Sequence, residues 1–264
     1  KNVSIADIDH DLFTAKRVED IIVLNLTEDL LLHAVDLSEK NRLFDYLEVI
    51  SESDEIKALL IMGSPGKTGR EEYIKFYGQV LANELDRNAI NRLYNAANQI
   101  ILKFVSFNKM VVHADSGNII SLFMNVSLAC DYRIIGDNTV FQKPYFELGL
   151  VPKGGGVFFL SKMLGLRKAS EILFSIKDIT AEEALRLGIV DQVVPADKLG
   201  EVALNKARDF ARRSGSSLSG IKGLFSCYMK DLADSLECEN KELLKIVSSP
   251  DFGKKMGEYT GDNS

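Results

Sequence analysis

Short apolar runs rich in β-branched residues recur along the first half of the chain. Ile21–Leu26 and residues 56–62 have the length and composition of buried strands. Residues 110–114 and 132–135 are two further runs of the same kind. Because a helical pattern with short connections separates the first two runs, the order predicts a parallel pair of strands joined by a right-handed crossover.

Helical patterns fill the intervals between these runs. Asp36 and Glu39 have the spacing of a capping box at the start of the first helical pattern. The apolar side chains of this pattern lie on one face: Leu43, Leu47 and Ile50. A second pattern, over residues 85–107, leads into the run at 110–114. Its apolar side chains also recur near helical period: Ile90, Leu93, Ala97, Ile101 and Phe104.

The chain beyond Pro195 is helical in pattern, over residues 197–213, 216–236 and 238–248. With 264 residues, of which 46% are hydrophobic, the chain can bury one sizeable core. We therefore predict an α/β core over residues 1–195 and a C-terminal helical region of the same domain over residues 196–264.

The net charge of −6 argues against a general nucleic-acid or anionic-membrane surface, although it permits a local basic pocket. No apolar run approaches the about 18 residues that mark a membrane-spanning helix. The N-terminal residues also lack the basic and then apolar pattern of a signal peptide. We therefore expect a soluble cytoplasmic protein without a nucleic-acid or membrane partner.

Cysteines and histidines are scattered along the chain. The cysteines are too few and too widely spaced for a disulfide framework or a CxxC metal site: Cys130, Cys227 and Cys238. His113 falls in a predicted buried strand, where a core histidine is the usual interpretation, and His10 and His33 have no spacing to further ligands. The sequence therefore predicts no catalytic metal.

Three motifs follow one another between residues 129 and 190. Residues 129–134 are Ala-Cys-Asp-Tyr-Arg-Ile, and residues 141–156 follow the pattern Phe-x-x-Pro-x-x-x-Leu-Gly-x-x-Pro-x-x-Gly-Gly. Residues 181–190 follow the pattern Ala-Glu-Glu-Ala-Leu-x-x-Gly-Ile-Val. In order and spacing, these motifs resemble the enoyl-CoA hydratase/isomerase (crotonase) superfamily. The resemblance implies a crotonase-like spiral α/β fold, related to the Clp-type peptidases, with repeated ββα units and C-terminal helices that build a homotrimer or hexamer.

The resemblance also implies a type of substrate. The superfamily binds an acyl thioester of coenzyme A, or of the phosphopantetheine of an acyl carrier protein, and polarises its carbonyl between two backbone N–H groups. No tightly bound cofactor is implied, because coenzyme A arrives as part of the substrate. Lys222 stands where family members often place a basic residue near the adenine and phosphates of coenzyme A. A solvated surface lysine is the alternative.

The two N–H groups of this oxyanion hole can be assigned by the same resemblance. Gly117 precedes the apolar segment 118–131, and a helix that starts after such a glycine has N–H groups without intrahelical partners. A plain buried helix is the alternative interpretation. The matching donors are the backbone N–H groups of Arg70 and Leu122. Because Leu122 replaces a glycine of the family pattern, we expect a narrower cavity.

Hydratases of the family hold a water between two glutamates, and this chain has neither of them. Asn125 stands at the first position and Tyr145 at the second. Asparagine cannot accept a proton at physiological pH, and an unperturbed tyrosine titrates at about 10, so neither imitates a carboxylate base. Glu147 is the nearest carboxylate in the motif, and is either a displaced base or part of a structural salt bridge. We therefore do not expect ordinary hydration.

Two lysines near the motifs invite other interpretations. Lys153 replaces a common glycine of the Pro-Gly-x-Gly-Gly turn, and faces either a carboxylate substrate or, more commonly, solvent. Lys67, within Gly66-Lys67-Thr68, suggests a nucleotide-binding loop. Ile61 stands where such a loop requires its first glycine, which argues against that interpretation.

Three functions remain open. The first is an acyl-thioester enzyme that performs isomerisation, decarboxylation or hydrolysis with unusual residues around Tyr145. Within this class, decarboxylases that act on carrier-protein thioesters in polyketide β-branching also lack the second glutamate, and Tyr145 or Lys75 can supply the proton. The second is a catalytically silent homologue that binds acyl-CoA or a partner protein. The third is a Clp-type peptidase using Ser121 or Ser127 with a lysine, although no such arrangement has a plausible spacing.

Overall fold

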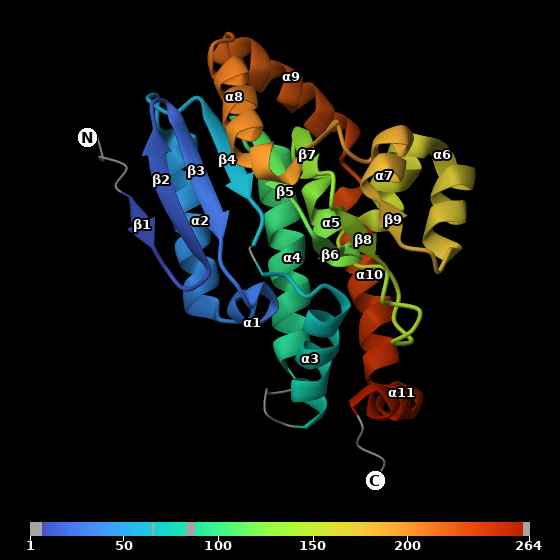
Figure 1. Cartoon of the computed structure of the whole chain (residues 1–264). Coiled ribbons are helices and arrows are strands. Elements are labelled where there is room, and N and C mark those ends of the chain that lie inside the picture. The colour runs from blue at the N-terminus through green and yellow to red at the C-terminus, as the bar shows by residue number, and fades with distance from the viewer. Residues whose placement is uncertain (1–6, 65, 83–87, 261–264) are drawn as a thin grey trace.

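The computed structural model describes residues 7–64, 66–82 and 88–260 (Figure 1). Within these residues, seven strands form one sheet in the order β1-β2-β3-β4-β5-β7-β10. Their bounds are β1 (Ile8–Asp9), β2 (Phe13–Val18), β3 (Ile21–Leu26), β4 (Ala58–Met62), β5 (Met110–Asp115), β7 (Tyr132–Gly136) and β10 (Gln192–Val194). The first three strands pair antiparallel, whereas β3, β4, β5, β7 and β10 run parallel.

A smaller sheet lies beside the main one, and its strands among the described residues have the order β6-β8-β9. Its strands are β6 (Asn118–Ile120), β8 (Val140–Gln142) and β9 (Ile179–Thr180). The helices are α1 (Leu30–Ala34), α2 (Leu37–Glu52), α3 (Arg70–Leu81), α4 (Asn88–Ser106), α5 (Ser121–Ser127), α6 (Gly156–Phe174), α7 (Ala181–Leu187), α8 (Leu199–Ala211), α9 (Gly215–Tyr228), α10 (Leu232–Val247) and α11 (Pro250–Thr260), with a 3-10 turn at Ala196–Lys198. Among the described residues, no helix has both the length and the apolar character needed to cross a bilayer.

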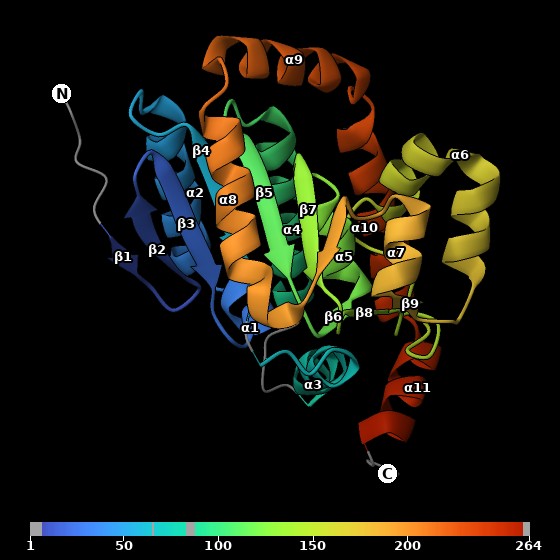
Figure 2. The ribbon, with the colours of Figure 1, turned by 45° about the horizontal axis from the view of Figure 1, so that its top comes forward.

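The main sheet is covered on both faces, as Figure 2 shows: α8 lies in front of it, and α2 and α4 lie behind. On the α8 side, Ala203 and Ala207 pack with Leu60 and Val112 in one buried cluster. On the other side, residues of α2 and α4 pack with Leu24, Leu59 and Val111. Parallel strands buried on both faces read as continuous apolar runs, which explains why they were recognisable in the sequence.

Most of the predicted elements are confirmed. The four predicted strands correspond to β3, β4, β5 and β7, and β3 and β4 pair in parallel. Asp36 caps α2, because its carboxylate accepts hydrogen bonds from the N–H groups of Ser38 (2.7 Å) and Glu39 (3.2 Å). The reciprocal half of the predicted capping box is not formed, since the Glu39 carboxylate accepts from the Leu12 N–H instead (3.2 Å).

Two expectations about helices are wrong. No helix starts after Gly117, because β6 follows it and α5 begins only at Ser121. A single helix over residues 216–236 is also wrong, since α9 ends at Tyr228 and α10 begins at Leu232. The break redirects the chain, so that Leu232 and Leu236 are buried in the core whereas the apolar side chains of α9 face outward. The domain boundary at residue 195 stays a prediction, although α8 packs on β4 and β5 of the core.

The carboxyl ends of the parallel strands meet at one edge of the main sheet. Met62 of β4 lies opposite Asn25 of β3 and Ala114 of β5, and Ala114 lies opposite Ile134 of β7. Ligands of open α/β sheets bind at this edge. The loops that follow β3, β4 and β5 therefore frame the candidate site.

Candidate functional site

Helix α5 packs closely against residues 153–156 at the centre of the site. We call these residues the glycine turn. Gly154 and Gly155 have positive φ angles of +94° and +78°, which residues with a Cβ rarely adopt. A Cβ on Gly154 would lie only 3.0 Å from the Leu122 carbonyl oxygen and 3.1 Å from the Asn125 Cβ. The turn thus fixes the backbone of α5 where sequence reasoning placed an oxyanion donor.

Asn125, which the resemblance predicts at the position of the first family glutamate, has a structural hydrogen bond. Its side chain is 1% exposed, and its Nδ2 donates to the Lys153 carbonyl oxygen at 2.8 Å. Its Oδ1 is buried and has no hydrogen-bond partner among the described residues. The Asn125 amide thus connects α5 to the glycine turn, and an amide cannot act as a general base.

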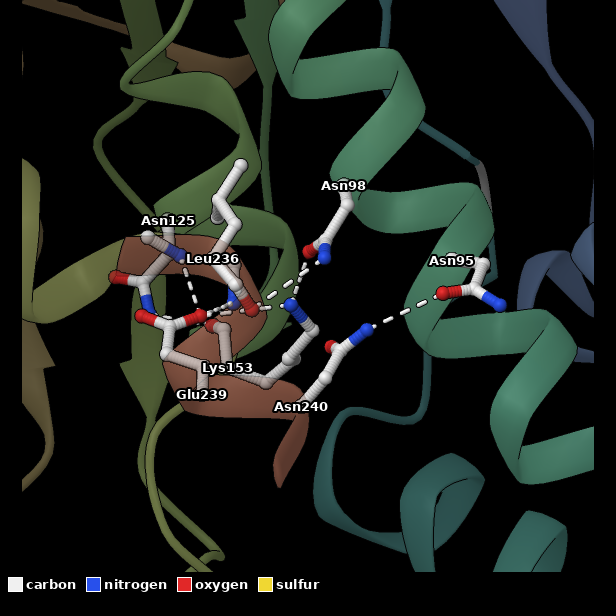
Figure 3. Close-up of polar contacts among 9 residues, drawn as sticks. Asn95, Asn98, Asn125, Lys153, Leu236, Glu239 and Asn240 are labelled. Carbon is white, nitrogen blue, oxygen red and sulfur yellow. Dashed lines mark hydrogen bonds and ion pairs between the residues drawn. The ribbon is translucent and has the colours of Figure 1, made fainter. Parts of the chain in front are cut away.

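A buried ion pair joins the same turn to α10 (Figure 3). Lys153 is 2% exposed, and its Nζ lies 3.5 Å from Glu239 Oε2 and donates to Asn98 Oδ1. Glu239 Oε2 also accepts the N–H groups of Gly154 (3.1 Å) and Gly155 (3.0 Å). The expectation that Lys153 faces solvent is therefore wrong. We call Asn98, Asn125, Lys153 and Glu239 the polar cluster.

Burial perturbs both members of the ion pair in opposite directions. It lowers the pKa of Lys153 and raises the pKa of Glu239, while the attraction between the two groups opposes each shift. The two N–H bonds to Glu239 also favour its ionised form. Buried pairs of this kind occur both at functional sites and in structural networks.

Tyr145, which the resemblance predicts at the position of the second family glutamate, is 2% exposed. Its hydroxyl donates to the Leu173 carbonyl oxygen at 2.8 Å, at the C-terminal end of α6. Burial raises the pKa of Tyr145 to about 12, so the hydroxyl stays protonated at neutral pH. Its one proton is committed to Leu173, which leaves Tyr145 unsuited to act as a base.

Arg70 and Glu147 meet on the surface of the site. Arg70 Nε lies 3.1 Å from Glu147 Oε2, and the guanidinium also approaches Asp178 (3.8 Å). Glu147 is interpreted from the sequence either as a displaced base or as part of a salt bridge, and the structure contains the salt bridge. The Arg70 backbone N–H donates to Gln142 Oε1 at 2.7 Å, so a predicted oxyanion donor is already bound to a side chain. Gly69 permits this approach, because a Cβ there would meet Gln142 Oε1.

Lys222 is not a solvated lysine. Its Nζ donates to Asp131 Oδ2 at 2.6 Å and to the Lys109 carbonyl oxygen at 2.8 Å, and its side chain is buried. Asp131 also accepts the Val111 N–H at 2.7 Å. Lys222 thus ties α9 to the start of β5, and a contact with coenzyme A phosphates would require it to leave Asp131.

The remaining candidates have local partners. Lys75 lies 3.4 Å from Asp29 on the surface. Ser127 Oγ donates to the Met124 carbonyl oxygen at 2.6 Å, and Ser121 is buried at the start of α5. No His, Cys, Asp and Glu group with the geometry of a metal site occurs in the described part of the chain.

A partly open apolar cavity lies beside the site, lined by residues of α1, α2, α4, α5 and the main sheet. Its volume is about 130 Å³, and Leu122 forms part of its wall. The edge nearest the strand ends carries Lys67 and Asp115, which form a buried ion pair, and Lys67 also donates to the Ser64 carbonyl oxygen at 2.8 Å. His113 lines the cavity too, and burial lowers its pKa to about 4.

Sequence reasoning missed the cavity and both buried ion pairs. A partial signal existed for one pair, since Lys67 follows β4 and Asp115 is the last residue of β5, and the carboxyl ends of these two strands must be neighbours in a parallel sheet. No comparable signal joins Lys153 to Glu239, which lie 86 residues apart.

Comparison with known proteins gives the same class as the fold. Residues 21–260 match the profile of the enoyl-CoA hydratase/isomerase family. The chain therefore belongs to the enoyl-CoA hydratase/isomerase family, and its fold is that of the crotonases.

Individual relatives are distant. The "Probable enoyl-CoA hydratase EchA17" of Mycobacterium tuberculosis is 26% identical over 82% of this chain and 84% of its own length. The trans-2-decenoyl-[acyl-carrier-protein] isomerase of Streptococcus mutans is 25% identical over 80% of this chain and 81% of its own length. The solved structure of enoyl-CoA hydratase from Bacillus halodurans superposes with a TM-score of 0.77 at 19% identity, covering 94% of this chain and 99% of that one. The last likeness concerns the fold.

Proposed function

We propose that this protein binds an acyl thioester at the N-terminal end of α5 and stabilises an enolate formed from it, without adding water to a double bond. In this proposal the thioester oxygen accepts a hydrogen bond from the Leu122 N–H. That group lies in the first turn of α5, where N–H groups lack intrahelical acceptors. Charge that develops on the oxygen is stabilised there in a site of low polarity.

The observation that carries the proposal is the state of Asn125 and Tyr145. Both polar groups are bound to carbonyl oxygens of the protein, and neither can accept a proton from a water molecule. Decarboxylation requires no such base, because loss of CO₂ leaves its electron pair on the substrate as an enolate. Decarboxylation of a malonyl-type thioester is accordingly the reaction we favour. The proton that quenches the enolate comes from solvent, because the Tyr145 hydroxyl donates to Leu173 and Lys75 lies beside Asp29 on the surface.

Mass spectrometry of mixtures with different thioesters tests this assignment. We expect crotonyl-CoA to bind without gaining a water, and malonyl-CoA or methylmalonyl-CoA to lose CO₂. Hydration of crotonyl-CoA at the rate of an ordinary hydratase would contradict the proposal. The same assay with the substrate on a carrier-protein phosphopantetheine determines which carrier the site accepts, including the carrier-protein decarboxylation of polyketide β-branching.

A catalytically silent acyl-thioester-binding protein is the second candidate, and the Arg70–Gln142 hydrogen bond favours it. With its N–H bound to Gln142, Arg70 cannot complete the pair of oxyanion donors. A silent protein binds both crotonyl-CoA and malonyl-CoA and turns over neither. If Gln142→Ala, which frees the N–H, then allows CO₂ loss, the blocked donor is the cause of the silence.

Exposed apolar side chains support self-association into a homotrimer, or a hexamer of two trimers. They lie on α6, on the loop after it and on α9: Leu166, Phe174, Ile176, Leu224, Phe225 and Tyr228. A contiguous exposed apolar patch marks an interaction surface, and we propose that these side chains contribute to one. Light scattering after gel filtration should give a trimer or hexamer, and the double variant Leu224→Lys, Phe225→Glu should give the monomer. A monomeric wild-type protein would contradict the assembly.

A further inference from the structure

We propose that Glu239 of α10 is a positioning residue of the thioester site: it holds the glycine turn against α5 and thereby fixes the direction of the Leu122 N–H. This inference rests on the proposed binding of an acyl thioester at that N–H. Glu239 lies outside the three sequence motifs, in the C-terminal helical region. The role therefore belongs to a part of the chain for which the motifs predict no function.

A single oxygen atom of Glu239 holds three consecutive residues of the glycine turn. Its Oε2 accepts the N–H groups of Gly154 (3.1 Å) and Gly155 (3.0 Å), and lies 3.5 Å from Lys153 Nζ (Figure 3). Glycine has access to many backbone conformations, so two adjacent glycines with φ angles of +94° and +78° do not keep this shape by themselves. The carboxylate selects this conformation, because it can bind both N–H groups only when they converge on it.

The glycine turn contacts α5 at two points. The Asn125 Nδ2 donates to the Lys153 carbonyl oxygen at 2.8 Å. Gly154 lies so close to Leu122 that a Cβ on the glycine would be 3.0 Å from the Leu122 carbonyl oxygen and 3.3 Å from Leu122 Cδ1. No side-chain hydrogen bond caps α5 at Ile120. The orientation of the first turn of α5, and of the Leu122 N–H within it, therefore depends on these contacts.

The support behind Glu239 is fixed in the core. On α10, Glu239 lies between Leu236 and Leu243, which are both buried. Lys153 Nζ also donates to Asn98 Oδ1 of α4, and Asn98 Nδ2 donates to the Leu236 carbonyl oxygen at 3.4 Å. The helices α4 and α10 thus form one packed support from which the carboxylate reaches the glycine turn.

Two double variants separate positioning from a merely stabilising role. Lys153→Met with Glu239→Leu replaces the ion pair by apolar side chains of similar size, a change that often costs little stability. It leaves no acceptor for the N–H groups of Gly154 and Gly155. Lys153→Met with Glu239→Gln is the matched variant, because the Gln oxygen can still accept both hydrogen bonds. The two variants differ in one side chain, and neither has a charge at the two positions.

Infrared spectroscopy of bound crotonyl-CoA, isotope-labelled at the thioester carbonyl, measures the hydrogen bond directly. A hydrogen bond to this carbonyl lowers its stretching frequency relative to that of the thioester in an apolar solvent. We expect this shift in the wild-type protein and in the double variant with Gln. The double variant with Leu should bind crotonyl-CoA and lose most of the shift, since its glycine turn no longer holds α5 in place.

The rate of CO₂ loss from malonyl-CoA is a second measure of the same donor. The double variant with Leu should lower kcat about a hundredfold, as the loss of an oxyanion donor does. Its KM should change less than about threefold, because the interaction is made chiefly in the transition state. The double variant with Gln should keep the kcat of the wild-type protein.

Glu239→Asp tests the same contact while it keeps a charge beside Lys153. The shorter side chain draws the oxygen back from the glycine turn, so we expect a smaller frequency shift than in the wild-type protein. Circular dichroism identifies the variants that fold, and Glu239→Asp suffices if the double variant with Leu does not fold. The matched control is Glu237→Gln on the exposed face of α10, which should keep the wild-type frequency.

The outcomes separate this inference from the proposed function. Failure of the wild-type protein to bind crotonyl-CoA, or binding without a frequency shift, would overturn the proposed function and this inference together. A wild-type shift in the double variant with Leu, or in Glu239→Asp, would overturn the positioning role alone. An equal loss of the shift in both double variants would also overturn it, because the charge and not the bound glycine turn would then be required.

Discussion

Two neighbouring regions of this protein differ in how completely protein atoms fill their interior space. In the polar cluster, Lys153, Glu239 and Asn125 bind one another or the glycine turn, and a single added methyl on Gly154 meets other atoms. In the apolar cavity, about 130 Å³ stays open beside Ala97. The region around Asn125 and Gly154 is thus tightly packed, whereas the neighbouring apolar region leaves space unfilled.

The largest expected effect comes from breaking the polar cluster. Glu239→Ala leaves the Lys153 ammonium buried without its carboxylate and leaves two N–H groups unpaired. Removal of one partner of a buried ion pair costs about 3–5 kcal/mol. Urea unfolding monitored by circular dichroism measures the loss. The control is Glu237→Ala on the exposed face of α10, for which we expect less than about 0.5 kcal/mol. A similar cost for both variants would show that the cluster contributes no special stability.

The cavity region should respond to acid through His113. Its pKa of about 4 in the folded protein lies below the ordinary value of 6.5, since burial and the charges of Lys67 and Arg133 outweigh the effect of Asp115. The unfolded chain therefore binds more protons between these values, and His113 lowers the stability as pH falls from 6.5 to 4, by about 3 kcal/mol in total. His113→Gln should remove this part of the pH dependence in urea titrations. Parallel pH profiles of the two proteins would contradict it.

The tightness of the glycine turn can be tested with one methyl group. Gly154→Ala combines a positive φ angle with a contact to the Leu122 carbonyl, and should cost about 2 kcal/mol of unfolding free energy. Gly223→Ala is the matched control, because a Cβ there meets no atom within 4 Å and the residue lies in α9. We expect the control to be neutral or to stabilise by up to about 1 kcal/mol. Equal losses would mean that the turn is no tighter than an exposed helix.

The smallest change in unfolding free energy should come from the substitution that adds the most atoms. Ala97→Leu introduces three carbons into the cavity, and the gain in apolar contact should offset local strain, so that stability changes by less than about 1 kcal/mol. Thermal and urea unfolding measure this change. A loss of more than about 3 kcal/mol would show that the space is not available to a side chain.

The sequence was most informative where local pattern determines structure. The apolar runs of β3, β4 and β5 predicted buried parallel strands, because such strands need no polar face. The start of α5 was misjudged, since Gly117 lies in the bend between β5 and β6, and β6, only three residues long, is defined by its pairing with distant β8. Such nonlocal pairing has no signature in a short stretch of sequence.

The assignment of the site residues stays a prediction. The family resemblance predicts Asn125 and Tyr145 at the two catalytic positions, where neither can act as a base. Their actual partners, Lys153 and Leu173, are backbone carbonyls 28 residues away, and no spacing rule indicates them. The cavity escaped notice because its size depends on how α2, α4 and α5 are spaced, and composition does not encode that spacing.

The pairing of Glu239 with the glycine turn has a consequence for synthesis on the ribosome. Lys153 leaves the exit tunnel 86 residues before its carboxylate partner, so a nascent chain that ends before α10 cannot form the turn as the finished protein has it. The glycine turn, and with it the proposed thioester site, is therefore among the last parts of the protein to assume its shape during translation.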